Sequence, residues 1–168
     1  NHGRIEQMGP PVQMYDLPKT AFVANFVGQS NLGQGRITGR DGDFLVAEVQ
    51  GTTVKIPSAR CSVESGEVTF GVRPEKVSVA RRQPDGTGND VRGRVLDVSF
   101  IGVATQYLVQ LPIGTVWSAY EQNLDLEAMD LRPGDEVWLT WKPGHAFGVA
   151  PDADAVKAAE AAKVGSTQ

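Results

Sequence analysis

The chain has 168 residues, about one domain with an appendage, and its net charge of −4 argues against a nucleic-acid binder because neutralising phosphates needs a basic surface. Its single cysteine, Cys61, excludes an internal disulfide, and two histidines add too few ligands for a typical zinc site. No run approaches the ~18 apolar residues of a membrane span, and the first residues lack the apolar core of a secretion signal, so we expect a cytoplasmic chain without direct membrane insertion.

The first thirty residues predict a short strand and two helical segments. Residues 3–9 are typical of a short strand, and Pro10-Pro11 can open a helical turn because proline suits the first position of a helix. Residues 20–28 predict a second helix with Thr20 as its N-cap. A helix this short is marginal alone in water, so its apolar face must pack on the rest of the chain or on a neighbouring copy. That face, a candidate interface, consists of Phe22, Val23, Phe26 and Val27.

From residue 31 onwards the pattern is that of short strands. Apolar residues alternate with polar ones at period two, and the 19 glycines and 10 prolines recur between these runs. About nine or ten strands fit between residues 31 and 150, which predicts a mainly β protein built as a barrel or sandwich. In the run 91–100 the apolar phase shifts between Val95 and Leu96, which predicts a β-bulge. The two halves of this region show no obvious sequence repeat.

Catalytic motifs are missing from the sequence. No Gly-Lys dipeptide occurs, so a P-loop of the form GxxxxGK[ST] is excluded. The G-x-G pairs at 33–35 and 86–88 lack the third glycine of a dinucleotide fingerprint. His2 and His145 lie near a terminus and in a turn, which are poor positions for a general base. We therefore expect no catalytic residue, no cofactor and no metal in this chain.

Aromatic and charged side chains mark candidate binding positions. Trp141 shares its phase with Val137 and Leu139, so we expect it in the core. Trp138 has the opposite phase and is a candidate interface residue, because tryptophan is enriched at interfaces. The candidate ligand-binding residues are Arg73, Arg92 and Arg94 for an anion, and Glu75, Asp97 and Tyr107 for an amine. The ordinary alternative for each is a surface side chain with no partner.

Two groups of motifs resemble a known family. G-R-I-E-Q-M-G-P-P at 3–11, followed by F-V-A-N-F-V-G at 22–28, closely resembles the end of the ATPase domain in ABC importer ATP-binding subunits that serve polyamines, ferric iron and sugars. F-G-V-R-P-E at 70–75 resembles a turn of the same proteins. P-G-D at 133–135 and W-K-P at 141–143 are similar to their terminal TOBE domain, an OB-like β-barrel.

The resemblance implies three parts. Residues 1–30 correspond to the end of the ATPase domain and a linker helix, 31–150 to an OB-like (TOBE) β-barrel, and 151–168 to a flexible or helical tail. In the family, ATP and magnesium belong to the preceding ATPase domain, whose Walker and signature motifs are absent here. The barrels of the homodimeric subunit contact each other, and the subunit works with permease subunits that span the membrane.

The resemblance therefore implies a non-catalytic regulatory and dimerisation domain at the inner face of the cell membrane. Its partners would be a second copy of itself and, through the parent protein, the permease subunits. A polyamine such as spermidine or putrescine is the expected solute, followed by iron and sugar. The alternative is a sensing domain that binds the solute or an oxyanion and regulates the ATPase. A third possibility, an OB-type nucleic-acid binder, is disfavoured by the acidic charge.

Overall fold

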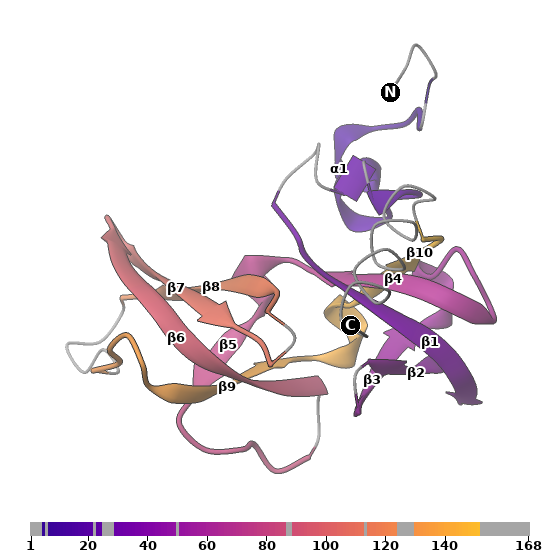
Figure 1. The fold of residues 1–168 in the computed structure, drawn as a ribbon. Helices are drawn as coiled ribbons and strands as arrows, with labels where there is room; N and C mark the ends of the chain where they lie inside the picture. Colours follow the sequence, from indigo (N-terminus) through magenta and orange to yellow (C-terminus); the bar gives the residue numbers. More distant parts are fainter. Residues whose placement is uncertain are drawn as a thin grey trace, which may run out of the picture.

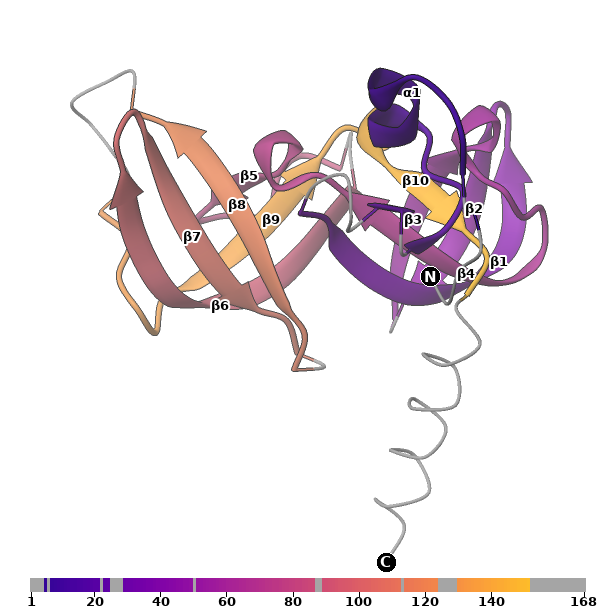
Figure 2. The same ribbon diagram turned by 90° about the horizontal axis from the view of Figure 1, so that it is seen from above.

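A computed structural model describes residues 5, 7–21, 23–24, 29–49, 51–86, 89–112, 114–123 and 130–151. The strands form two antiparallel five-stranded sheets that lie side by side and are both curled, so the chain is mainly β and OB-like as predicted (Figures 1 and 2). The first sheet has the order β10-β4-β1-β2-β3 and the second has the order β5-β9-β6-β7-β8. The first comprises β1 (Asn31–Asp41), β2 (Phe44–Val49), β3 (Thr52–Pro57), β4 (Gly66–Val72) and β10 (Phe147–Val149). The second comprises β5 (Ser78–Ala80), β6 (Asn89–Ile101), β7 (Ala104–Gln110), β8 (Val116–Gln122) and β9 (Glu136–Trp141).

The chain folds as two similar halves that exchange their last strands. Strands β1–β5 form the first half and β6–β10 the second, and counterparts occupy the same places in both sheet orders. The exchange places β5 beside β9 and β10 beside β4, with a 3-10 turn before each exchanged strand: η2 (Pro74–Lys76) and η3 (Pro143–His145). This repeat is not evident in the sequence because the two halves share an order of strands and few identical residues. Its clearest sequence trace is the pattern N-x-x-x-G-R, which opens both β1 and β6.

A β-bulge in each half bends its longest strand. The pairing of β6 with β7 shifts register between Val95 and Asp97, which confirms the bulge predicted from the phase shift at Leu96. The pairing of β1 with β2 shifts in the same way between Ile37 and Gly39. An extra residue increases the local twist and bends the strand, which helps each sheet to curl.

Two buried asparagines join the halves. The Asn31 amide donates to the carbonyl of Ser118 at 2.7 Å and accepts from its N–H at 2.8 Å. Asn89, the equivalent residue of β6, makes the same pair of bonds with the backbone of Lys55, both at 2.8 Å. Ser118 lies in β8 and Lys55 in β3, which are edge strands of their sheets. Each asparagine therefore satisfies backbone groups at an open sheet edge of the opposite half.

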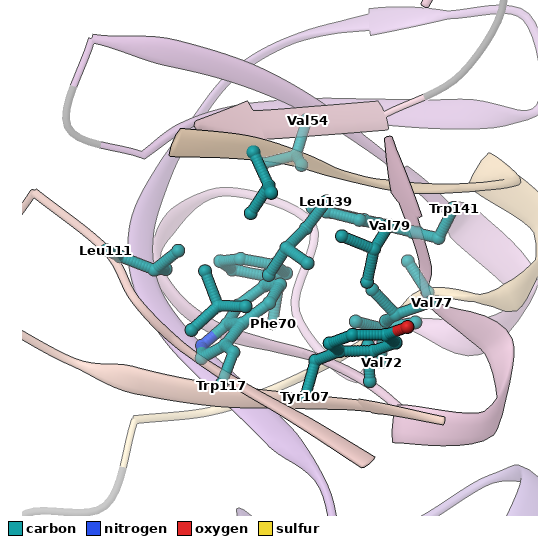
Figure 3. Packing of buried hydrophobic residues seen from close by; sticks show 14 of the residues in the cluster. Val54, Phe70, Val72, Val77, Val79, Tyr107, Leu111, Trp117, Leu139 and Trp141 are labelled. Atoms are coloured by element: carbon teal, nitrogen blue, oxygen red, sulfur yellow. The ribbon is translucent and has the colours of Figure 1, made fainter. Parts of the chain in front are cut away.

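One continuous hydrophobic cluster extends across both sheets (Figure 3). Its centre is aromatic: the ring centroids of Phe70 and Trp117 are 5.6 Å apart, and those of Trp117 and Trp141 are 5.4 Å apart. Trp141 is buried, as its phase predicted. Burying each large apolar side chain contributes about 1.5–3 kcal/mol, so this shared cluster is the main force that holds the two halves together.

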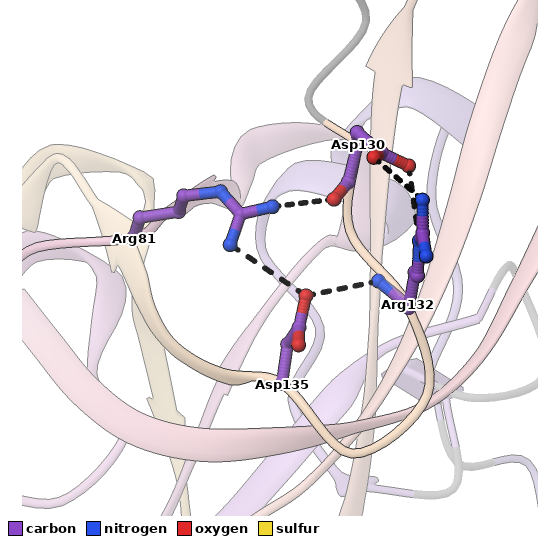
Figure 4. Close-up of polar contacts among 4 residues, drawn as sticks. All are labelled: Arg81, Asp130, Arg132 and Asp135. Carbon is purple, nitrogen blue, oxygen red and sulfur yellow. Dashed lines mark hydrogen bonds and ion pairs between the residues drawn. The ribbon is translucent and has the colours of Figure 1, made fainter.

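A polar network ties the turn before β9 to the chain after β5 (Figure 4). Arg81 donates to the carbonyl of Asp130 and lies 3.6 Å from the Asp135 carboxylate. Asp135 also accepts from the N–H of Arg132 at 3.1 Å, and Arg132 pairs with the Asp130 carboxylate at 3.0 Å. The ion pairs are largely exposed and solvent screens their attraction, so the network orders this turn more than it stabilises the fold.

The N-terminal segment lies against the first sheet (Figure 2). Helix α1 (Pro11–Asp16) begins at Pro11, as predicted, whereas Ile5, Gln7 and Met8 are not in a strand. In the second helical segment the N–H of Val23 donates to the Thr20 hydroxyl at 3.2 Å, which confirms the predicted N-cap. Ala24 is fully buried and packs with β10. The described part of this helix thus packs on the chain itself, and Phe22, Phe26 and Val27 fall outside the described residues.

Candidate functional site: an arginine joint

A buried arginine holds the N-terminal segment against the first sheet and the turns beside it. Arg73 follows β4 and precedes Pro74, and it adopts the extended backbone that a residue before proline favours. This places its side chain beneath the N-terminal segment, where it is only 4% exposed. Its Nη1 donates to the carbonyl of Ala24 at 2.8 Å and to the Ser30 hydroxyl at 2.6 Å. Its Nη2 donates to the carbonyl of Tyr15 at 2.9 Å.

Two aromatic rings flank the Arg73 guanidinium. The guanidinium carbon lies 4.1 Å from the ring centroid of Tyr15 and 5.8 Å from that of Phe147. Arginine suits this position because its planar group can stack on rings while its fork donates to several carbonyls. Burial lowers the pKa of Arg73. The charge of Asp16 raises this pKa, and the charge of Arg60 lowers it further. The usual pKa of arginine is so high that the group stays charged at neutral pH.

A second arginine and a tyrosine complete the contact. Arg60, in the 3-10 turn η1 (Ser58–Arg60), donates to the carbonyl of Asp16 at 2.6 Å and to that of Gly144 at 2.8 Å. The Tyr15 hydroxyl donates to the Glu75 carboxylate. We call Arg60, Arg73, Tyr15 and Glu75 the arginine joint. It connects the C-terminal end of α1 to the turns η1, η2 and η3 and so holds the N-terminal segment in place.

The other sequence candidates lie in separate places. Arg92 and Arg94 lie on the outer face of β6 and, with Glu136, line a surface hollow of about 420 Å³. Glu136 pairs with Arg92, and no described residue bonds to the guanidinium of Arg94. Asp97 is exposed and accepts from Ser99 at 2.7 Å. The structure therefore brings Arg92 and Arg94 together, and it does not bring the amine candidates Glu75, Asp97 and Tyr107 into one group.

Two further candidates are used mainly for packing. Tyr107 is 1% exposed in the core, and burial, followed by the charge of Glu121, raises its pKa. Val23 is buried against the chain itself. Trp138 is half-buried on the outer face of β9, opposite Arg92 of the neighbouring strand. Of the candidate interface residues in the described ranges, only Trp138 retains appreciable exposure.

Sequence reasoning missed a basic hollow beside the joint. Lys76, Lys142 and His145 line a hollow of about 480 Å³ together with Glu75. Burial lowers the pKa of His145, and the charges of Lys76, Lys142 and Arg60 lower it further, so the surroundings favour the neutral imidazole. The signal in the sequence was the pair of similar turns R-P-E-K and K-P-G-H, which the strand exchange places next to each other. Within the described ranges no cluster of side chains suits a metal ion, and no helix could cross a membrane.

Comparisons with known proteins place these features in a family. Residues 70–149, from β4 to β10, match the TOBE domain family. The chain is 36% identical over 149 residues to the spermidine/putrescine import ATP-binding protein PotA of Acidothermus cellulolyticus, a match that covers 88% of this chain and 39% of that protein. The chain belongs to the TOBE-containing portion of ABC importer ATP-binding subunits. The PotA of Thermotoga maritima matches similarly, at 30% identity over 156 residues, covering 88% of this chain and 41% of that protein.

A solved structure has the same fold as the TOBE-containing chain. The cytoplasmic molybdate-binding protein ModG, with molybdate bound, has a TM-score of 0.63 at 18% identity, covering 72% of this chain and 96% of ModG. At this identity the likeness shows the fold alone. The chain spans about two fifths of the length of its PotA relatives. The arginine joint connects two parts of this chain. Arg73 and Glu75 lie within the residues that match the TOBE family, and Tyr15, to which they bond, precedes that match.

Proposed function

We propose that this chain is the non-catalytic regulatory and dimerisation domain of an ABC importer's ATP-binding subunit, and that the importer carries a polyamine such as spermidine or putrescine. The likeness to several PotA proteins supports the solute class. In this proposal the ATPase domain of the longer protein holds ATP and magnesium, outside this chain. The subunit pairs with a second copy and works with membrane-spanning permease subunits at the inner face of the cell membrane.

The arginine joint is the observation that carries this proposal. It fastens the first sheet and the turns beside it to a segment that resembles the end of the ATPase domain, so movements of that domain would be passed to the sheet. The same segment exposes Ile5, Met8 and Val12. Exposed apolar side chains that cluster on one segment fit a surface that more of the ATPase domain covers.

The test uses the full-length subunit in cells that lack their own copy. Arg60→Met removes two bonds of the joint without removing a fully buried charge, and Arg36→Met, at an exposed ion pair with Glu67, is the matched control. We expect labelled spermidine uptake to fall about fivefold or more with R60M, the lower end of ordinary coupling free energies, and to stay near wild type with R36M. Equal uptake by both variants would contradict the role of the joint. Uptake of sugar or iron in place of polyamines would contradict the solute class.

A second candidate function is the sensing of an oxyanion. The hollow between Arg92 and Arg94 favours it over amine sensing, because the acidic candidates do not converge on one place. ModG, a protein of the same fold, is described as binding molybdate. Guanidinium groups suit tetrahedral oxyanions, to which they donate in pairs.

Calorimetry distinguishes the two functions. If the hollow is a sensor, molybdate, sulfate or phosphate will bind saturably, and Arg94→Gln will weaken binding about tenfold, the loss expected for one charge-assisted bond. Arg40→Gln, an exposed arginine of β1, should leave binding unchanged. An absence of saturable heat at millimolar anion contradicts the sensor and leaves the regulatory domain as the function.

A further inference from the structure

The first part of β6 has one unpaired edge. Its residues 89–94 pair with β9 on one side, whereas the pairing with β7 on the other side begins only at Arg94. The N–H and carbonyl of Val95 both bond to the turn before β9. Backbone groups alternate in direction along a paired strand, so those of Asp90 and Arg92 point to the β7 side, where no described residue bonds to them. We call the backbone of Asp90 and Arg92 the open edge.

A proline explains why the pairing stops. Continuing the β6–β7 register beyond Arg94 and Gln110 would place Pro112 opposite Arg92. Proline has no N–H to donate, so it cannot extend the ladder of hydrogen bonds, and β7 ends at Gln110. Thus β6 is an inner strand of its sheet, yet its first part has the unpaired backbone of an edge strand.

The internal repeat shows how such an edge can be closed. In the first half, Leu32 is the equivalent of Asp90, and its carbonyl accepts from the indole N–H of Trp117 at 3.1 Å. The counterpart of Trp117 is Val54, because each directly precedes the residue that a buried asparagine bonds in the opposite half. Valine has no donor, so the carbonyl of Asp90 is left open. An unpaired edge of this kind is a template for another strand.

The two faces beside the open edge differ in chemistry. On the outer face, Arg92 and Arg94 border the hollow of about 420 Å³. On the inner face, Val91 borders a cavity of about 60 Å³ with mostly apolar walls, among them Val49. Leu111 lines both spaces, so they adjoin each other. The side chains of an added strand would alternate between the two faces, and would meet a positive charge on one and a small apolar space on the other.

We propose that the open edge binds an extended segment of a partner protein as an added strand, with a carboxylate of that segment paired to Arg94. Main-chain bonds supply affinity in this mode of binding, and alternate side chains supply selectivity. Arg94 provides the positive charge because Glu136 is taken by Arg92. Asp90 lies two residues before Arg92 on the same face of the strand, so a second acidic side chain beside it is disfavoured. The partner segment therefore alternates small apolar residues with a single acidic one.

A labelled peptide tests the added strand on the complete 168-residue chain. The probe is a fluorescein-labelled, amidated pentapeptide that alternates valine with one glutamate and one threonine, and fluorescence anisotropy follows its binding. At saturation, hydrogen exchange at the amides of Asp90 and Arg92 should slow about tenfold or more, because bonds to the probe protect them. Methylating the backbone nitrogens of the probe removes its donors and should weaken binding about tenfold.

Exchanging the charges isolates the role of Arg94. Arg94→Gln should weaken binding of the glutamate probe about tenfold, the loss expected for one charge-assisted bond. The same variant should leave unchanged the binding of a probe with glutamine in place of glutamate, because the two changes remove one and the same contact. Arg36→Gln is the matched control: it is the equivalent residue of the first half and already pairs with Glu67, so this variant should bind the probe like wild type.

Two results would overturn the inference. If the methylated probe binds as tightly as the unmethylated one, charge alone holds the peptide and the open edge accepts no strand. If the chain binds sulfate at Arg94 but binds neither peptide at millimolar concentration, the hollow is an anion site only. Both results leave the proposed regulatory role unaffected, because that role rests on the arginine joint and not on β6.

Discussion

Replacing Arg73 with methionine is expected to lower the free energy of unfolding by about 3 kcal/mol, because hydrogen bonds from a charged donor contribute about 1.5–3 kcal/mol each and the relieved burial of the charge offsets part of their loss. The carbonyls of Ala24 and Tyr15 would lose a donor in a place that water reaches poorly. Urea unfolding of the chain measures the loss. Hydrogen exchange of the amides next to Tyr15, Ala24 and Ser30 should quicken in step, because Arg73 bonds to these residues.

Two further variants distinguish the stability lost with the arginine joint from the effect of replacing any arginine. Arg36→Met removes an exposed ion pair with Glu67, and we expect it to change stability by less than about 1 kcal/mol. Arg73→Lys keeps the charge but cannot donate in the same fork or stack on Tyr15, so its stability should fall between wild type and R73M. If R73M is no less stable than R36M, the joint does not hold the N-terminal segment.

The strands and the bulge of β6 could be predicted because both are local features of the sequence. Alternation of apolar residues shows which side of a strand is buried, and the phase shift at Leu96 is itself the extra residue of the bulge. The exchange of β5 and β10 could not be predicted in this way. Each has only three residues, Ser78–Ala80 and Phe147–Val149, and such short runs carry too little pattern to select a sheet.

The candidate site shows the same limit. The sequence indicated Arg73 as a possible ligand of an anion, and the structure places its guanidinium against backbone oxygens of residues 44–58 positions earlier and against the hydroxyl of Ser30. Backbone carbonyls carry no sequence signature, so no motif could have named them as partners. A usable signal was the position of Arg73 between the buried Val72 and Pro74, since an arginine directly after a core strand must either turn outwards or find acceptors inside.

The paired asparagines offer a prediction in which the two halves serve as controls for each other. Asn31→Ala is expected to lower the free energy of unfolding by about 3 kcal/mol, because it leaves the N–H and carbonyl of Ser118 buried without partners. Asn89→Ala makes the equivalent change at Lys55, where the strand is more exposed and water can replace part of the loss, so about 2 kcal/mol is expected. Thermal or urea unfolding measures both.

The double variant extends the argument to the sheet edges. Asn31 and Asn89 share no bonding partner. The losses of unfolding free energy in the two single variants should therefore add within about 0.5 kcal/mol if each asparagine acts on its own edge strand. Removing Asn31 frees the backbone of β8 at the edge of the second sheet, and we expect this variant to aggregate at lower temperature than wild type, because an open strand edge pairs with other chains. Light scattering during heating measures this. Stability losses below about 0.5 kcal/mol for both single variants would mean that the aromatic cluster alone holds the halves together.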